Sequence, residues 1–293
     1  MEEHNHNSER IGWTIFLNIV ITVAEYFGGI FSGSLALLSD AGHNLSDVIS
    51  LILSYFGEKL SQKKSTQNHS FGFKRVEIFT ALINALSLWA IGIFIISEAV
   101  KRINRQDSIS IGLMLGIASI GLFGNVFSIL ILNKNKNENL NMKAAYLHLF
   151  YDAISSVAVI VSGIIIYFTD WRLLDIFVSV FIALMIFWSG FGIIKKAVHI
   201  FMQGVPEGIE FDDVYKTILG VKGVRSVHSL HLWSINSKDA FMSCHICTED
   251  KKADTDKIIL MVNRIVEKKF DIRHTTIQIE RNKLCDSGKV CCK

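Results

Sequence analysis

Long apolar runs dominate the first two thirds of the chain, and a mixed polar pattern follows them. Six of these runs are at least as long as the roughly 20 residues that an α-helix needs to cross a bilayer core. They are Ile11–Phe31, Leu35–Tyr55, Ile78–Ala99, Ile109–Leu132, Ala144–Phe168 and Leu173–Ile194. The pattern predicts a polar N-terminal segment over residues 1–10 and an all-α membrane domain of six helices over residues 11–204.

From residue 205 the spacing of apolar positions changes. The predicted helices are Phe211–Leu219 and Lys257–Phe270, and the predicted strands are Val224–Ile235, Ala240–Thr248 and His274–Glu280. The order helix, strand, strand, helix, strand predicts a small two-layer α+β domain over residues 205–282. A tail that contains cysteines follows over residues 283–293.

Charge refines this picture. Only 19% of the residues are charged, below the roughly 25% of soluble domains, and the net charge of +3 gives no reason to expect a nucleic-acid partner. Five Lys and Arg residues follow the second run, three follow the fourth and two follow the sixth. This bias predicts that both termini are cytoplasmic, although Lys101, Arg102 and Arg105 after the third run oppose it. The five cysteines cluster in the C-terminal third, which favours a reducing compartment over a disulfide framework.

Two copies of the spacing His-x-x-x-Asp stand inside the apolar runs, at His43–Asp47 and His148–Asp152. Residues i and i+4 stack on one face of a helix, so each pair presents an imidazole beside a carboxylate. An ionisable group at membrane depth costs about 2.5–3.5 kcal/mol even on insertion scales, so such groups indicate a functional site. Together the pairs supply four ligands, the number that a tetrahedral Zn²⁺ site needs.

An alternative interpretation is that each histidine only hydrogen-bonds the neighbouring aspartate as a polar contact between helices. The same spacing on two helices favours the metal site. Asp40 belongs to the same stripe as His43 and Asp47, and Asn44 follows His43 directly. A fifth ligand is not required, so we expect Asp40 and Asn44 to support the ligands or to contact other helices.

The charge of the four groups indicates how such a site would work. With neutral histidines the two carboxylates carry −2, which Zn²⁺ cancels. Without metal, protons must offset the buried charge, so metal and protons compete for the same groups. This competition is the basis of a metal/proton exchanger. Four protein ligands leave no open metal position for a hydrolytic water, so we expect no enzyme activity.

Longer motifs resemble the cation diffusion facilitator family along nearly the whole chain. They are GGIFSGSLALLSDAGHNLSD, NHSFGFKRVEIFTALINA, HLFYD, VHSLHLWS and TIQIE. The resemblance implies a six-helix membrane domain, a ferredoxin-like cytoplasmic domain, and a homodimer that exports a divalent cation as protons enter. His/Asp pairs on both helices resemble zinc-preferring members, and imidazole ligands suit Zn²⁺, which Co²⁺ or Cd²⁺ can follow.

The resemblance also implies a metal site in the cytoplasmic domain, through residues that match His228, His245 and Glu280. The sequence is equally compatible with these three residues only packing together. Regular alternation would put His228 and His231 on opposite faces of a strand, so both should not join one site. We therefore expect His231, with Trp233, to serve packing or an interface.

Two further residues match family positions. His69 lies in the loop after the second run, where some members hold a second metal site. Its neighbours Thr66 and Phe73 cannot supply the other ligands, so His69 would bind metal only weakly, and a solvated histidine is the alternative. Glu25, in the first run, should make a helix contact or line the path.

The cysteines allow two interpretations. Cys244 and Cys247 stand three residues apart in a predicted strand and so point to opposite faces, whereas His245 and Cys247 share a face and form the better pair. The tail cysteines either hold a soft metal or are exposed thiols; they are Cys285, Cys291 and Cys292.

The sequence thus predicts a homodimer in a lipid bilayer that exports Zn²⁺ by proton antiport. Zn²⁺ is the transported substrate and is also predicted to bind as a regulatory ion. The short termini resemble bacterial members and favour a bacterial inner membrane. Two alternatives remain open. One is the same fold carrying Co²⁺, Cd²⁺, Fe²⁺ or Mn²⁺, and the other is a membrane metal sensor or scaffold that does not transport.

Overall fold

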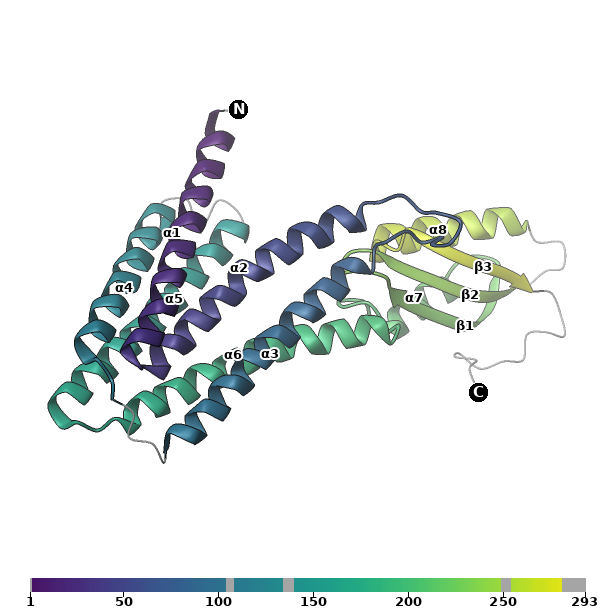
Figure 1. Cartoon of the computed structure of the whole chain (residues 1–293). Coiled ribbons are helices and arrows are strands. Elements are labelled where there is room, and N and C mark those ends of the chain that lie inside the picture. Colours follow the sequence, from purple (N-terminus) through teal and green to yellow (C-terminus); the bar gives the residue numbers. More distant parts are fainter. Residues whose placement is uncertain (1, 104–107, 134–139, 249–253, 281–293) are drawn as a thin grey trace. The chain divides into compact units, whose positions relative to one another are not determined.

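The computed structural model describes residues 2–103, 108–133, 140–248 and 254–280. By internal contacts the chain forms two compact units, Met1–Tyr55 with Ile83–Ile193, and Phe56–Leu82 with Ile194–Lys293. Six long helices correspond to the six apolar runs (Figure 1): α1 (Glu2–Ser32), α2 (Leu35–Ser61), α3 (Val76–Ile103), α4 (Ile111–Asn133), α5 (Leu140–Thr169) and α6 (Leu173–Phe201).

The helices form a transmembrane domain. Within the described residues, four stretches are long and apolar enough to cross a membrane, judged by length and composition: Val76–Ile103, Ile111–Leu130, Leu149–Thr169 and Leu173–Phe201. A shorter apolar stretch, Phe16–Ser32, lies in α1. Large apolar side chains such as Phe123, Phe127 and Leu184 are exposed. Such a surface suits lipid rather than water, so the predicted helical membrane domain is confirmed.

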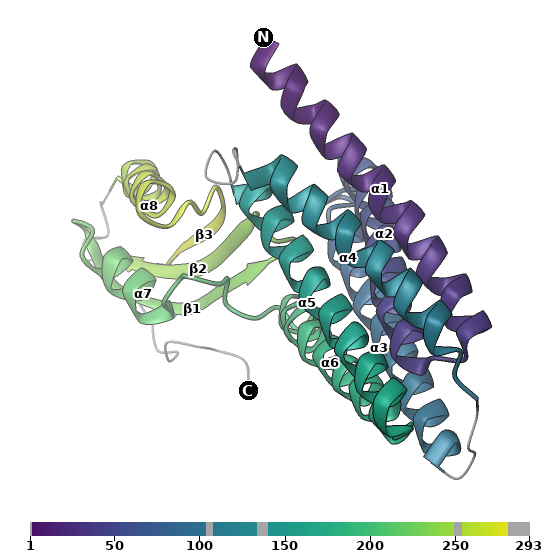
Figure 2. The ribbon, with the colours of Figure 1, turned by 90° about the vertical axis from the view of Figure 1, so that its left-hand side faces the viewer.

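Small residues bring α1 and α4 close together, and the two helices run side by side in Figures 1 and 2. A Cβ added at Gly124 would lie 2.3 Å from the Ile21 side chain. One added at Gly121 would lie 2.2 Å from Glu25 Oε1. Both glycines therefore permit an approach that a larger residue would prevent. The apolar core of this unit includes Leu37, Ile95, Met114, Val159 and Ile186.

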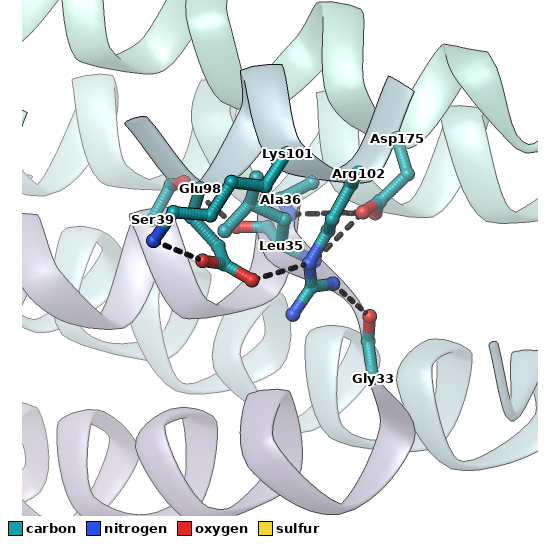
Figure 3. A network of polar contacts seen from close by, with 8 residues as sticks. All are labelled: Gly33, Leu35, Ala36, Ser39, Glu98, Lys101, Arg102 and Asp175. Carbon is teal, nitrogen blue, oxygen red and sulfur yellow. Dashed lines mark hydrogen bonds and ion pairs between the residues drawn. The ribbon is translucent and has the colours of Figure 1, made fainter. Parts of the chain in front are cut away.

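The Asp175 carboxylate of α6 fixes the first turn of α2 (Figure 3). It accepts hydrogen bonds from the Leu35 N–H at 2.7 Å and from the Ser34 hydroxyl at 2.6 Å. The Ser34 oxygen in turn accepts from the Leu37 N–H at 3.1 Å. A helix start leaves these N–H groups without intrahelical partners, and its dipole favours a negative charge there. The start of the helix that carries His43 and Asp47 is thus anchored to α6.

Arg102, near the end of α3, holds the turn between α1 and α2 (Figure 3). Its guanidinium donates to the Gly33 carbonyl at 2.5 Å and pairs through Nε with Glu98 Oε1 at 3.3 Å. Gly33 has a φ of +73°, a left-handed conformation that glycine adopts without strain. The turn before α2 is therefore fixed from α3 as well as from α6.

The second unit contains a three-stranded sheet with two helices on one face (Figure 2). Its elements are α7 (Phe211–Leu219), β1 (Val224–Ser234), β2 (Ala240–Thr248), α8 (Thr255–Phe270) and β3 (His274–Glu280). β1 pairs with β2 antiparallel, and β2 pairs with β3 in parallel. A parallel pair needs a crossover connection, which α8 provides. The predicted small α+β domain is confirmed.

Apolar side chains fill the space between this sheet and its two helices. The fully buried ones include Val214, Ile218, Leu230, Met242, Ile246, Val262 and Val266. Each such side chain contributes about 1.5–3 kcal/mol when it leaves water. The core therefore fixes which face of each strand turns away from the helices, and the polar side chains of the sheet gather on that opposite face.

A β-bulge changes the alternation of side chains along β1. His228 pairs with His245 on β2, and three residues further on His231 pairs with Ser243, only two residues away from His245. Ser229, inside the bulge, has a φ of +47°. The extra residue reverses the alternation, so His228 and His231 lie on the same face of the sheet. The prediction that they lie on opposite faces is wrong.

The loop before α3 belongs to the second unit and contacts the strands of its sheet. Lys74 Nζ donates to Asp239 Oδ2 at 2.7 Å and holds the pKa of that carboxyl below its usual range. The Phe71 ring meets the Phe241 ring edge-on, with 5.5 Å between centroids. The loop is therefore attached to the turn between β1 and β2 and to the neighbouring end of β2.

Removing the Asp175 carboxylate should destabilise the transmembrane domain. In Asp175→Ala the start of α2 loses a buried acceptor, which costs about 1–3 kcal/mol. Asp175→Asn keeps one carbonyl oxygen and should lose less. The thermal midpoint of the purified protein in detergent should fall in the order wild type, Asn, Ala. Asp170→Asn, at an exposed position, is the control, and an unchanged midpoint for Asp175→Ala would contradict the anchoring role.

Candidate metal centre

Three of the four predicted membrane ligands meet between α2 and α5. His43 Nε2 lies 3.7 Å from Asp47 Oδ2 and 4.0 Å from Asp152 Oδ1. The His43 and Asp47 side chains are 26% and 25% exposed, whereas the Asp152 side chain is buried. One imidazole and two carboxylates from neighbouring helices are thus placed within reach of a single cation, and they are ligand types that Zn²⁺ accepts.

The fourth predicted ligand, His148, belongs to α5 and precedes Asp152 by one helical turn. Its side chain lies outside the described residues. The His148 ligand role therefore stays a prediction that rests on the spacing of the sequence, in which positions i and i+4 share one helix face.

Asp40 supports the site instead of extending it. Its buried carboxylate accepts hydrogen bonds from the Ser155 hydroxyl at 2.5 Å and from the Ser156 hydroxyl at 3.4 Å. Both serines lie on α5, beside Asp152. These bonds hold α2 against α5 near the ligands, which is the supporting role expected for Asp40.

Asn44 connects the ligand helix to α1. Its Nδ2–H donates to Glu25 Oε2 at 2.8 Å, and both residues are completely buried. Glu25 therefore makes the helix contact that the sequence predicts for it. Since Asn44 follows His43 directly, this contact lies one residue from the candidate metal ligands.

A cavity of about 420 Å³ reaches His43 and Asp47. The other residues that line it are Tyr151 and Ser155 of α5 and Ile182, Met185, Ile186, Trp188 and Ser189 of α6. The cavity is consistent with the partial exposure of the His43 and Asp47 side chains. The share of α6 in this wall has no signal in the sequence, because its lining residues are not ionisable.

A second cluster lies on the polar face of the sheet, where the carboxylate of Glu280 joins two histidines. His228 Nε2 lies 3.1 Å from Glu280 Oε2, and His245 Nδ1 lies 2.8 Å from Glu280 Oε1. The two imidazole rings are 5.2 Å apart. The three residues named from the sequence are thus brought together, with His228 and Glu280 buried and His245 partly exposed.

Cys247 joins this cluster, and it is the residue that the sequence-based ligand set leaves out. Its Sγ lies 3.9 Å from His228 Nδ1, and ligand atoms of His228, Cys247 and Glu280 all lie within 4.8 Å of one another. The shared face of His245 and Cys247 is the signal that points to it. Cys244 faces the apolar core instead, where burial raises the pKa of its thiol to about 12.

The remaining candidates are not among the residues of the two described clusters. His69 is in an exposed loop, with its ring centroid 4.6 Å from that of Phe73, and its weak ligand role stays a prediction. His231 shares the polar face with His228 but is not among the three residues grouped above. The tail residues Cys285, Cys291 and Cys292 lie outside the described residues.

Two family profiles match the chain. Residues 13–202 match the cation efflux transmembrane domain, and residues 206–282 match the cytoplasmic domain of cation efflux proteins. A solved structure of the metal-bound C-terminal domain of the CzcD transporter from Cupriavidus metallidurans is 34% identical to the chain. It covers 25% of this chain and 99% of that one, with a TM-score of 0.23.

Full-length relatives extend these matches. A cadmium, cobalt and zinc/H(+)-K(+) antiporter of Bacillus subtilis is 36% identical, over 99% of this chain and 96% of the relative. The zinc transporter ZitB of Escherichia coli is 31% identical, over 94% of this chain and 88% of the relative. The chain belongs to the cation efflux family, the cation diffusion facilitators, and is a membrane transporter of metal cations rather than an enzyme.

Proposed function

We propose that this chain exports Zn²⁺ from the cytosol in exchange for protons, through a site formed by His43, Asp47, His148 and Asp152. The observation that carries the proposal is the meeting of His43, Asp47 and Asp152 from two helices beside a cavity in the transmembrane domain. The site would face the two sides of the membrane in turn.

The charge of the cluster supplies the coupling. With neutral imidazoles, the carboxylates of Asp47 and Asp152 carry −2, and one Zn²⁺ cancels it. Buried charges without a counter-charge cost several kcal/mol each, so the metal-free site must take up protons before it changes its orientation. Metal and protons then occupy the same groups in alternation, which makes the flow of one depend on the flow of the other.

Zn²⁺ is the cargo that the ligand chemistry favours. Imidazole suits Zn²⁺ better than Mg²⁺ or Mn²⁺, which prefer oxygen ligands alone. The names of the relatives support zinc, and that of the Bacillus subtilis relative adds cadmium, cobalt and potassium. Cd²⁺ and Co²⁺ are therefore the second candidate cargo, and Fe²⁺ and Mn²⁺ have less support from the ligand set.

The same relatives support a proposal for the assembly and the location. We place the protein in a bacterial plasma membrane as a homodimer, with both termini in the cytoplasm. Bacterial transporters are among its relatives, and the distribution of Lys and Arg supports the orientation. The match to the cytoplasmic domain of cation efflux proteins supports the assignment of residues 206–282 to the cytosol.

The cytoplasmic cluster fits a regulatory Zn²⁺. Imidazole, carboxylate and thiolate are all zinc ligands. His228 Nε2 and Glu280 Oε2 approach each other at 3.1 Å, yet neither atom has a hydrogen bond to a described residue. Two buried polar atoms that lie close together without hydrogen bonds are suited to binding one cation between them. His228, His245 and Glu280 would hold the ion.

Loss of a membrane carboxylate should abolish export. Even partners outside the ligand shell change metal affinity about 10–100-fold, so loss of a ligand in Asp47→Ala or Asp152→Asn should exceed that range. Zinc accumulation in inside-out vesicles, followed with a zinc dye, should fall to the background rate. Asp170→Asn serves as the control for an exposed acid. Near-normal flux in a folded Asp47→Ala protein would contradict the site, and zinc binding without flux in wild type would favour the sensor alternative.

Zinc binding at the membrane site should weaken as the pH falls. The ligands must be deprotonated to hold the metal, so acid protonates them and displaces the metal. The affinity should fall roughly tenfold per pH unit for each proton displaced. Calorimetry in buffers of different ionisation enthalpy would count those protons. Affinity that stays constant between about pH 7.5 and 5.5, or no proton release, would be incompatible with exchange.

The cytoplasmic cluster should bind a separate zinc ion. In the full chain, His228→Ala combined with Glu280→Gln should remove one bound zinc per chain and leave the membrane site able to transport. Equilibrium dialysis counts the bound zinc, and His231→Ala is the matched control on the same face. An unchanged zinc count in the double variant would rule the site out.

A further inference from the structure

Glu25 is a buried carboxyl of the transmembrane domain that lies outside the metal cluster. It is completely buried on α1, and α1 runs beside α4 in both views (Figures 1 and 2). Its Oε2 accepts one hydrogen bond, from Asn44 Nδ2 at 2.8 Å. Its Oε1 lies against Gly121 of α4 and has no hydrogen bond to any described residue.

The surroundings of Glu25 do not neutralise a negative charge. The groups that interact with it electrostatically are Asp40 on α2 and Asp152 on α5, which are both acids. α4 contains no ionisable residue. Within the described residues no basic side chain forms an ion pair with Glu25. An ionised carboxyl in this position would be a buried charge without a counter-charge, which is costly, whereas a neutral carboxyl needs no counter-charge.

The packing admits a proton but leaves no room for a larger cation. A Cβ on Gly121 would lie 2.2 Å from Oε1, so the α4 backbone closes that side. Asn44 directs an N–H donor at the other oxygen. Metal cations need several oxygen ligands arranged around them, whereas a proton needs one oxygen and no additional volume.

The neighbouring amides can accommodate both protonation states. An amide donates through nitrogen and accepts through oxygen, so Asn44 can serve a carboxylate or, with its amide reversed, a carboxylic acid. Its Oδ1 has no hydrogen bond to a described residue. Asn125 lies one turn after Gly121 on α4 and is completely buried. Its Oδ1 and Nδ2 likewise have no hydrogen bond to a described residue. Asn44 and Asn125 therefore provide uncharged polar groups on the helices that pack against α1.

We propose that Glu25 is a proton-binding site separate from the metal ligands and that it carries one of the exchanged protons. This inference rests on the proposed zinc–proton exchange. Zn²⁺ at the neighbouring cluster neutralises Asp152, and its positive charge favours ionisation of Glu25. The O–H bond of the Glu25 carboxyl then breaks, its electron pair stays on the carboxylate, and the proton passes to water. After the metal leaves, a proton from the opposite side restores the O–H bond.

The test measures the number of protons exchanged per zinc. Proteoliposomes containing the full-length protein are given a pH difference, while thiocyanate, a permeant anion, removes the membrane voltage. The slope of the logarithm of the steady-state zinc ratio against the pH difference equals that number. Glu25→Gln should lower the slope by one, which is a ~10-fold smaller zinc ratio at one unit of pH difference. A packing defect alone would slow the approach to steady state without changing its value.

Matched variants make the result decisive. Glu25→Asp keeps a titratable group and should restore the wild-type slope, and Thr22→Val changes a buried polar residue of α1 and should leave the slope unaltered. A wild-type slope in Glu25→Gln would overturn the proposal. If the steady-state zinc ratio of the wild-type protein did not depend on the pH difference, the proposed exchange itself would be overturned.

A second readout does not require transport. Infrared difference spectra of the purified protein, recorded with and without Zn²⁺, should show loss of a buried carboxylic acid C=O band when the metal binds. This band should be absent in Glu25→Gln and shifted in Glu25→Asp. If Glu25→Gln leaves the spectrum unchanged, Glu25 does not hold the proton, whatever the vesicles show.

Discussion

Buried negative charge in the transmembrane domain is the constraint on which the rest of the structure depends. Asp47 and Asp152 approach one histidine from two helices, and Asp40 and Glu25 lie close by. Within the described residues, the basic side chains of this unit lie towards the ends of the helices. Carboxylates in such a setting cost several kcal/mol each unless a cation or a proton joins them. A cation or protons bound among these carboxyl groups would offset that cost, as the proposed exchange requires.

The scaffold has to hold these acids in place against their mutual repulsion. Asp175 anchors the first turn of α2. The Ser155 and Ser156 hydroxyls of α5 donate hydrogen bonds to Asp40 of α2. Asn44 ties the same helix to α1. These hydrogen bonds position α2 from three neighbouring helices, so His43 and Asp47 are held by partners that are not themselves ligands. Ligands supported in this way meet a cation without reorganising, which keeps the cost of binding low.

Spacing along single helices made much of the membrane site predictable. The His43–Asp47 pair follows from helical periodicity alone, and so do the six long helices. Contacts between helices are a different matter, because no local pattern in the sequence reports which oxygen of α1 faces which amide of α2. The anchoring by Asp175 and the Glu25–Asn44 bond therefore emerged only from the fold. In the sheet, one bulge at Ser229 reversed the expected face of His231. Side chains alternate between faces only where each residue of a strand pairs with one residue of its neighbour, and a bulge breaks that pairing.

The two candidate metal sites differ in their ligand types and in their exposure. The membrane cluster offers nitrogen and oxygen ligands, and His43 and Asp47 are partly open to a cavity. The cluster on the sheet adds the sulfur of Cys247 and buries both His228 and Glu280. A transport site must release its ion on the far side, so very tight binding there would slow turnover. In the proposed function, the open membrane cluster would therefore carry its ion reversibly, and the buried cluster on the sheet would retain its ion.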